Sequence, residues 1–366
     1  MAKKLLKTVL VILGIILLAA AALILWLSVT EFKPGDVMDV KVEANSEVSG
    51  LSPFLDEEFS VISWNIGYAG LGKGSDFFMD GGTNVSSADQ DTVAASLLGI
   101  YKTLYSSSDP ATIFMLQEVD KNSSRTYGKD EAYALGINNS TYALNYSCKF
   151  VPYPVPPIGR VNSGLLTTTV YDIDSAERIS LPCPFNWPVS TANLKRCLLV
   201  SYLPISGTSS KLVIVNLHLE AYDDGEGKIA QTKQLREFIQ SEYEKGNYVI
   251  AGGDFNQIFP NGLDKYPNTH KDLWEPGTIS EDIMPEGWTL AYDLETPSCR
   301  LLNQPYDPSD TENTQHYVID GFILSPNVEL VEVNTLDEGF TYSDHNPVKL
   351  QVKLSSENNY NSWTAR

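Results

Sequence analysis

The clearest sign of the fold is the stretch Tyr248-Val-Ile-Ala-Gly-Gly-Asp254-Phe-Asn256, in which an apolar run ends in a carboxylate and an amide two positions apart. Short runs of β-branched and aromatic residues of this kind are typical of buried strands. Because side chains alternate along an extended segment, Asp254 and Asn256 point to the same side. The sequence therefore predicts a buried strand that presents two polar groups at its carboxyl end.

The same pattern recurs on both sides of this strand. Other strand-like apolar segments end in an amide, a carboxylate or an imidazole, and these residues are Asn65, Glu118, His218, Asp320, Asp344 and His345. Polar groups at strand ends converge on one edge of a sheet, so we expect two histidines and at least four carboxylates to lie together. Such a set suits one divalent cation and one phosphate ester.

In this order, the motifs resemble those of the endonuclease/exonuclease/phosphatase superfamily, which has the DNase I-like fold. The resemblance covers roughly Phe59 to Val352. It implies an α/β (α+β) four-layer sandwich, in which two packed, mostly antiparallel sheets are flanked by helices. Apolar residues near helical spacing over Thr92–Tyr105 and Ile229–Tyr243 agree with helices on the outer faces.

The resemblance implies that Asn65, Glu118 and Asp344 hold a metal ion. Glu118 ends an apolar strand, which fixes its carboxylate, and it matches the glutamate that holds the metal in the family. Mg²⁺ is the expected ion, with Mn²⁺ as the alternative, because a hard cation prefers oxygen ligands. For Asn65 the other interpretation is an amide that satisfies the following loop.

The resemblance also implies the catalytic residues His218, Asp254, Asn256, Asp320 and His345. Asp254 would orient or deprotonate the attacking water, and Asn256 would hydrogen-bond the phosphate. Asp320 would hold the imidazole of His345 against the phosphate and favour its protonated form. His218 would stabilise charge or protonate the leaving group from the opposite side.

Three further residues are expected to contact the substrate. Arg125 and Tyr127 follow Glu118 in a segment that resembles the one from which many members supply an arginine or a tyrosine to the phosphate. Arg125 would bind phosphate oxygens in a bidentate manner, and a surface salt bridge is the alternative. Lys73 lies in the glycine-rich stretch 67–82, which predicts a mobile rim with a cation for an anionic head group.

Two features bear on specificity. The segment Val151-Pro-Tyr-Pro-Val-Pro-Pro157 cannot be a central strand, and it predicts an extended loop near the mouth of the site. Asp320 is followed by Gly321, where many family members have a large residue. We therefore expect a more open leaving-group side.

The expected function is a membrane-anchored, Mg²⁺-dependent phosphoesterase that hydrolyses a phosphodiester or phosphomonoester by attack of water. The net charge of −20 disfavours a basic groove for nucleic acid, so a surface nuclease is an alternative only. A phospholipid or sphingomyelin head-group phosphodiesterase is the other alternative. A non-catalytic binding domain is least expected, because it predicts the loss of at least one of Glu118, His218, Asp254 or His345, and all are present.

The N-terminus differs in composition from the rest of the chain. The uncharged run 8–29 is long enough to cross a bilayer of about 30 Å, and three lysines lie in residues 1–7. By the positive-inside rule we expect residues 1–7 in the cytoplasm, a transmembrane helix over 8–29 and the catalytic domain outside the cytoplasm. A signal peptide cleaved at the small residues 19–22 is the alternative.

The remaining boundaries follow from composition. Residues 30–58 are polar and rich in chain-breaking residues, which predicts a linker before a domain over 59–354 and a tail over 355–366. The expected partners are a phosphoester substrate and the membrane, and no stable protein partner is expected. The four cysteines lack metal-ligand spacing; outside the cytoplasm Cys183 and Cys197 form the nearest potential disulfide, although three full pairings are open.

Overall fold

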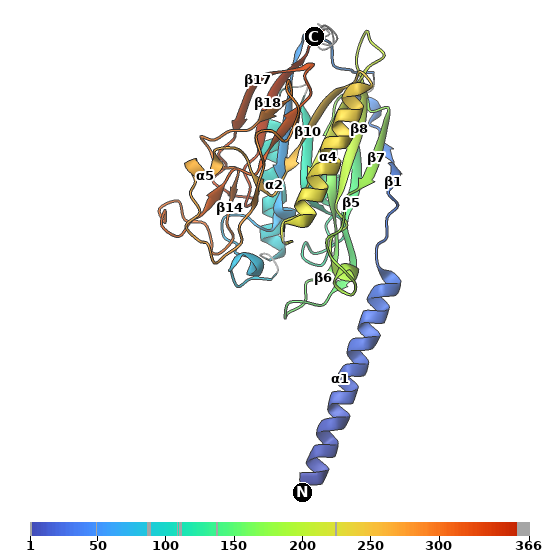
Figure 1. Cartoon of the computed structure of the whole chain (residues 1–366), viewed down its shortest axis with the longest axis vertical. Coiled ribbons are helices and arrows are strands. Elements are labelled where there is room, and N and C mark those ends of the chain that lie inside the picture. The colour runs from blue at the N-terminus through green and yellow to red at the C-terminus, as the bar shows by residue number, and fades with distance from the viewer. Residues whose placement is uncertain are drawn as a thin grey trace.

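Two packed sheets form the centre of the fold (Figure 1). The structure is a computed structural model that describes residues 2–48, 50–85, 89–107, 109, 112–136, 138–223 and 225–356. In this part of the chain, the first sheet contains, in spatial order, β1 (Val37–Val40), β7 (Ser175–Ser180), β8 (Cys197–Pro204), β9 (Lys211–His218), β10 (Tyr248–Asp254), β16 (Asp320–Leu324) and β13 (Thr289–Ala291). The second contains β17 (Val328–Thr335), β18 (Val348–Leu354), β3 (Glu58–Asn65), β4 (Ile113–Asp120), β6 (Gly159–Thr169), β5 (Asn139–Val151) and β2 (Val42–Glu43).

Helices cover the outer faces of the two sheets. The apolar faces of both sheets meet in one core, where Val61 of β3 and Ile250 of β10 are fully buried. On the outer face of the second sheet, α2 (Gln90–Ser106) packs through Ile100, and on that of the first, α4 (Glu226–Glu244) packs through Leu235. The four-layer sandwich and the mostly antiparallel sheets are therefore confirmed, as are both expected helices.

The remaining elements are the long helix α1 and several short helices, strands and turns. They are α1 (Ala2–Thr30), α3 (Glu131–Leu135), α5 (Gly262–Lys265), β11 (Gln257–Ile258), β12 (Gly277–Thr278), β14 (Cys299–Arg300), β15 (His316–Tyr317) and the 3₁₀ turns η1 (Ser46–Val48), η2 (Gly67–Ala69), η3 (Phe78–Asp80) and η4 (Val189–Ala192). The tail expected over 355–366 lies outside the described residues except for 355 and 356.

The segment expected to be a linker, 30–58, is instead part of the domain. Its strand β1 pairs with β7 and extends the first sheet, and β2 pairs with β5 and extends the second. Both strands lie at sheet edges, where strands are short and largely exposed, so they lack the buried alternation that marks a central strand. The polar composition of 30–58 therefore reflects edge strands and loops on the domain surface.

The helix α1 projects from one end of the sandwich, and its last turns pack against the domain (Figure 1). Leu27 is buried in an apolar cluster on β5 and β6. Trp187 Nε1 donates a hydrogen bond to Ser28 Oγ at 2.9 Å, and Lys195 forms an ion pair with Glu31 at 3.0 Å. By length and composition α1 can cross a membrane, although a signal sequence has the same properties.

The described part of the chain contains no disulfide, and all four cysteines are free. Cys183 is exposed, whereas Cys197 is buried at the start of β8. The pair that is closest in sequence is therefore not bonded.

The edge strands give a stability prediction. A fragment that begins at Glu57 lacks β1 and β2 and leaves the edges of β7 and β5 unpaired, so we expect its melting temperature to fall by about 5 °C or more. The control is a fragment that begins at Glu31 and keeps both strands. Equal melting temperatures of the two fragments, measured by circular dichroism, would show that 31–56 adds nothing to the domain.

Candidate active site

The sheet register brings the candidate catalytic side chains to one place. The parallel pairing of β9 with β10 sets His218 opposite Asp254, and the antiparallel pairing of β10 with β16 sets Asp254 opposite Asp320. Gly253 has a positive φ of 146°, and a Cβ at this position would lie 1.9 Å from the carbonyl oxygen of Leu217. The glycine before Asp254 is therefore required for the close approach of β9 and β10.

These side chains line a cavity of about 660 Å³. The sequence-predicted residues on its wall are Asn65, Glu118, Arg125, His218, Asp254, Asn256, Asp344 and His345. Most of them are buried, which removes the competition of bulk water for their hydrogen bonds and charges. Asp320 lies behind His345 and is 1% exposed.

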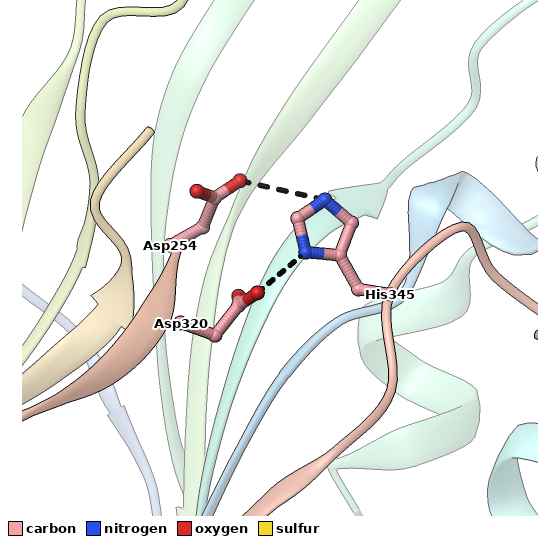
Figure 2. A group of neighbouring side chains, drawn as sticks. All are labelled: Asp254, Asp320 and His345. Carbon is pink, nitrogen blue, oxygen red and sulfur yellow. Dashed lines mark hydrogen bonds and ion pairs between the residues drawn. The ribbon is translucent and has the colours of Figure 1, made fainter. Parts of the chain in front are cut away.

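His345 lies between two carboxylates (Figure 2). Its Nδ1 is 2.8 Å from Asp320 Oδ2, and its Nε2 is 3.7 Å from Asp254 Oδ2. Burial disfavours the charged ring, but the attraction of Asp320 and the other carboxylates outweighs it and raises the pKa of His345 well above its usual value. The geometry therefore favours a protonated imidazole held in a fixed orientation.

Asp254 lies within hydrogen-bond or ion-pair distance of Asn65, Asn256 and both histidines of the site. Its Oδ1 accepts the backbone N–H of Asn256 at 2.8 Å, and its Oδ2 accepts Nδ2 of Asn65 at 3.0 Å. Burial raises the pKa of Asp254 to about 6, although the charge of His345 and these hydrogen bonds act in the opposite direction. A carboxylate with a pKa close to neutral is suited to accept a proton from water.

The pKa of His218 is shifted in the opposite direction from that of His345. Its Nε2 lies 3.3 Å from Asp254 Oδ2. Burial lowers the pKa of His218 well below its usual value, and the charges of Arg196 and His345 add to the effect. Neutral His218 and cationic His345 are thus favoured. This pair suits a hydrogen-bond donor on one side of a bound phosphate and a positive charge on the other.

Asn65 links Glu118 and Asp254 through hydrogen bonds. Its Nδ2 donates to Glu118 Oε1 at 3.3 Å as well as to Asp254, while its Oδ1 accepts the backbone N–H of Gly67 at 3.0 Å. The amide therefore satisfies the following loop and orients two carboxylates at once. Glu118 has a φ of 56°, an uncommon value for a residue with a side chain, at the irregularity between β4 and β6. Such strain often accompanies functional sites.

The oxygen donors in the cavity fit a hard divalent cation. Glu118 and Asp344 both line the cavity. Burial raises the pKa of Asp344 to about 7, with a further contribution from repulsion by Glu118. A cation between two such carboxylates would relieve this repulsion. Ligand atoms of Asp254, Asp320 and His345 also lie within 4.8 Å of one another, but both ring nitrogens of His345 face carboxylates, which favours a proton over a metal there.

Asn256 has a backbone conformation that its residue type tolerates. Its φ is 49°, in the left-handed region where asparagine is enriched. Its Nδ2 donates to the carbonyl oxygen of Leu219 at 2.8 Å, which fixes the side chain on the cavity wall. Asn256 thus lines the cavity together with Asp254, but through a left-handed residue after the end of β10 and not through the alternation of an extended segment.

Arg125 is neither a surface salt bridge nor a free cation. It forms two hydrogen bonds with Asp120, at 2.9 and 3.0 Å, and its guanidinium lies 3.5 Å above the ring of Tyr68. Its side chain is 13% exposed, and it lines the cavity. The arginine is therefore held rigidly at the wall, with its position set by a carboxylate behind it and an aromatic ring beside it.

The other two expected substrate contacts lie elsewhere. Tyr127 is 49% exposed and does not line the cavity in the described part of the chain. Lys73 borders a separate surface hollow that also includes Ser96 and Thr341. The start of the glycine-rich stretch, 67–71, is buried, so that part of it is packed against the domain.

Three residues on the wall carry no signal in the local sequence pattern. Asp80 accepts a hydrogen bond from the hydroxyl of Tyr222 at 2.8 Å, and burial raises the pKa of Asp80 to about 6. Arg300 is 1% exposed and donates to the carbonyl oxygens of Gly72 and Ser75. Asp80 lies in η3, Tyr222 in the segment after β9 and Arg300 in β14, so only the fold brings these residues together.

The leaving-group side is not opened by Gly321. A Cβ at this position would lie 2.8 Å from Phe259 Cζ and 2.9 Å from the carbonyl oxygen of Ala291. The aromatic ring of Phe259 therefore fills the space that a larger residue at 321 would need.

Comparison with solved structures identifies the fold. An endonuclease/exonuclease/phosphatase from Beutenbergia cavernae DSM 12333 matches at 16% identity and a TM-score of 0.53, over 81% of this chain and 72% of that one. The endonuclease/exonuclease/phosphatase from Bacteroides vulgatus matches at 15% identity and a TM-score of 0.51, over 82% of this chain and 100% of that one. No family model matches the sequence, and no match was found among curated proteins. This chain has the DNase I-like fold of the endonuclease/exonuclease/phosphatase superfamily.

Proposed function

We propose that this protein is a Mg²⁺-dependent phosphoesterase that hydrolyses a phosphodiester or phosphomonoester by attack of water. The observation that carries the proposal is a connected set of side chains. Asn65, Asp254 and His345 line one cavity with Glu118, and Asp320 pairs with His345 from behind. The set contains a proton acceptor, a fixed cation and a cation-binding group. Attack of water on a phosphoester requires these three functions.

Each side chain of the set has its own role in the proposed reaction. Asp254 holds the attacking water and takes its proton, which its pKa of about 6 permits. The imidazolium of His345, fixed by Asp320, stabilises negative charge on the phosphate oxygens. His218 and Asn256 flank the phosphate with N–H donors. Glu118 and Asp344 would hold the metal, with Asn65 orienting Glu118; a bound Mg²⁺ would neutralise charge on the phosphate.

The membrane anchor is a second part of the proposal. The helix α1 is long and apolar, and the lysines at its start favour a cytoplasmic N-terminus with the catalytic domain on the other side. We expect the full-length protein to stay with membranes during an alkaline carbonate wash and to keep an N-terminus upstream of residue 8. Release of the protein with a new N-terminus near Ala22 would identify a cleaved signal peptide instead.

The activity is tested with the full-length protein in detergent micelles. We expect release of p-nitrophenol from bis-p-nitrophenyl phosphate or from p-nitrophenyl phosphate in the presence of Mg²⁺, and loss of that release in EDTA. Plasmid DNA in a parallel reaction tests the nuclease alternative. Cleavage of plasmid much faster than of either small ester would favour the nuclease, and hydrolysis that is indifferent to EDTA would reject the metal-dependent chemistry.

A further inference from the structure

The cavity that holds the catalytic side chains has a wall made by the N-terminal helix. Leu23, Ile24 and Leu27, here called the helix wall, line the same cavity as Asp254 and His345. Leu23 and Leu27 lie one turn apart and pack against β5 and β6. A helix that served only as a tether would not need to form part of the cavity wall. Because α1 does so, the medium around α1 adjoins the cavity.

The length of α1 places the helix wall close to the hydrocarbon of a membrane. The apolar part that does not touch the domain, residues 8–22, spans about 22 Å at the helical rise. The hydrocarbon core of a bilayer is about 30 Å thick. A spanning α1 must therefore place some of residues 23–30, which pack on the domain, within the apolar layer.

The exposed side chains of residues 23–30 also support a position of this segment within the apolar layer of the membrane. Leu25, Trp26 and Val29 lie on the side of α1 away from the domain and are 66%, 44% and 77% exposed. Large apolar side chains of this exposure are stable in lipid and costly in water. Trp26 is also of the residue type that is enriched where membrane and water meet.

Two segments of the domain near α1 carry exposed apolar side chains. Tyr153 and Val155 lie in the turn between β5 and β6, and Trp187 and Val189 lie at the start of η4; we call these four residues the apolar rim. All four are more than half exposed, and Val155 is 88% exposed. Tyr153 and Val189 also line the cavity, and Trp187 donates its hydrogen bond to Ser28 of α1. Three of the rim residues therefore adjoin the cavity or α1, and Val155 lies two residues from Tyr153 in the same turn.

We propose that the substrate is a phosphoester lipid of the membrane in which α1 is embedded, taken up through the mouth of the cavity beside the helix wall. The proposal rests on the proposed function, because it assigns the substrate class of the same site. The apolar part of the lipid remains against Leu23 and Leu27, while its phosphate reaches Asp254 and His345. An apolar wall beside a polar floor fits a molecule with these two parts.

The reaction is a balanced hydrolysis. The oxygen of one water molecule forms a bond to phosphorus, and one of the two ester P–O bonds of the lipid breaks. Asp254 accepts one proton of that water, and the proton passes through solvent to the oxygen of the alcohol product. No oxidant, reductant or further co-reactant is needed.

The test uses full-length protein reconstituted into vesicles of phosphatidylcholine, phosphatidylethanolamine, phosphatidylglycerol and sphingomyelin. Phosphorus NMR follows every lipid phosphate at once, and bis-p-nitrophenyl phosphate in the same samples reports the basal activity. We expect Mg²⁺-dependent conversion of at least one lipid in the vesicles that contain the protein, and at least tenfold slower conversion in added vesicles that lack it. Hydrolysis of the soluble ester without conversion of any lipid would overturn this proposal and leave the proposed function intact. Failure to hydrolyse either would reject both.

A variant pair tests the role of the apolar rim. Val155→Asp places a charge in the turn that carries Tyr153, outside the cavity lining; if this turn contacts lipid, as the proposal requires, the ratio of lipid to soluble-ester hydrolysis should fall about tenfold. The matched control is Val331→Asp, at an exposed position on β17 far from α1 (Figure 1). Equal ratios for the two variants would overturn the proposal, since the rim would then contribute nothing to lipid access.

Discussion

Asp254→Asn is expected to lower the turnover of any phosphoester substrate by about 10²-fold or more. Asparagine preserves the size of the side chain and can accept the backbone N–H of Asn256, but it cannot take a proton from water. Burial already disfavours the ionised carboxylate, as its pKa of about 6 indicates, so removing the charge should cost little stability. The expected result is thus a large loss of turnover with a small change in melting temperature.

The control for this variant is Asp264→Asn, at an exposed position in α5 outside the cavity. It makes the same chemical change and should leave turnover unaltered. Both proteins are compared by initial rates of p-nitrophenol release at saturating Mg²⁺ and by thermal unfolding. Turnover of Asp254→Asn within a few-fold of the unsubstituted protein would remove Asp254 from the role of proton acceptor.

Glu118→Gln should lower turnover by about 10²- to 10³-fold at low Mg²⁺, because it removes a carboxylate in the cavity that we propose as a ligand of the metal. Raising the Mg²⁺ concentration should restore part of the activity, since weaker binding is offset by mass action. The loss in Asp254→Asn should not respond to Mg²⁺ in this way. The two variants therefore separate metal binding from proton transfer.

Glu237→Gln is the control for Glu118→Gln, since Glu237 lies on the exposed face of α4 in a surface ion pair with Lys233. Rates are measured across a Mg²⁺ titration for the unsubstituted protein, Glu118→Gln and Glu237→Gln. A Glu118→Gln protein with an unchanged Mg²⁺ dependence would show that the metal is held elsewhere. The group formed by Asp254, Asp320 and His345 would then be the next set of donors to test.

The central strands and the site motifs were predictable because local pattern and tertiary structure agree there. The run that ends at Asp254 is buried on both faces, and sequence alone shows a continuous apolar segment of strand length. The register then places Asp254 beside His218 and Asp320, as the order of the motifs implies. The polar residues at the ends of β9 and β10 meet as predicted, whereas Asp320 begins β16 and His345 precedes β18, so the resemblance and not a strand end indicated these two residues.

The edge strands and the packing of α1 were not predictable for a physical reason. The strand β1 is mostly exposed, so its side chains carry no alternation that distinguishes it from a polar linker. The burial of Leu27 depends on a partner surface on β5 and β6, more than one hundred residues away in sequence. A uniformly apolar helix gives no indication of which face is covered by protein.

The contacts of Arg125 show a similar limit. Its segment suggested a cation for phosphate, but the pairing with Asp120 and the stacking on Tyr68 depend on a turn with left-handed backbone at Tyr68. The hydrogen bond between Asp80 and Tyr222 joins loops from opposite halves of the chain. Contacts of this kind follow from the assembled fold and leave no periodic signal.

The most direct test of the account is the turnover of bis-p-nitrophenyl phosphate by the full-length protein as Mg²⁺ is added back after treatment with EDTA. We predict no turnover in EDTA and a saturable return of turnover as the Mg²⁺ concentration rises. A folded protein with no turnover of this ester, of p-nitrophenyl phosphate or of membrane lipids at any Mg²⁺ or Mn²⁺ concentration would contradict the proposal that this cavity hydrolyses phosphoesters.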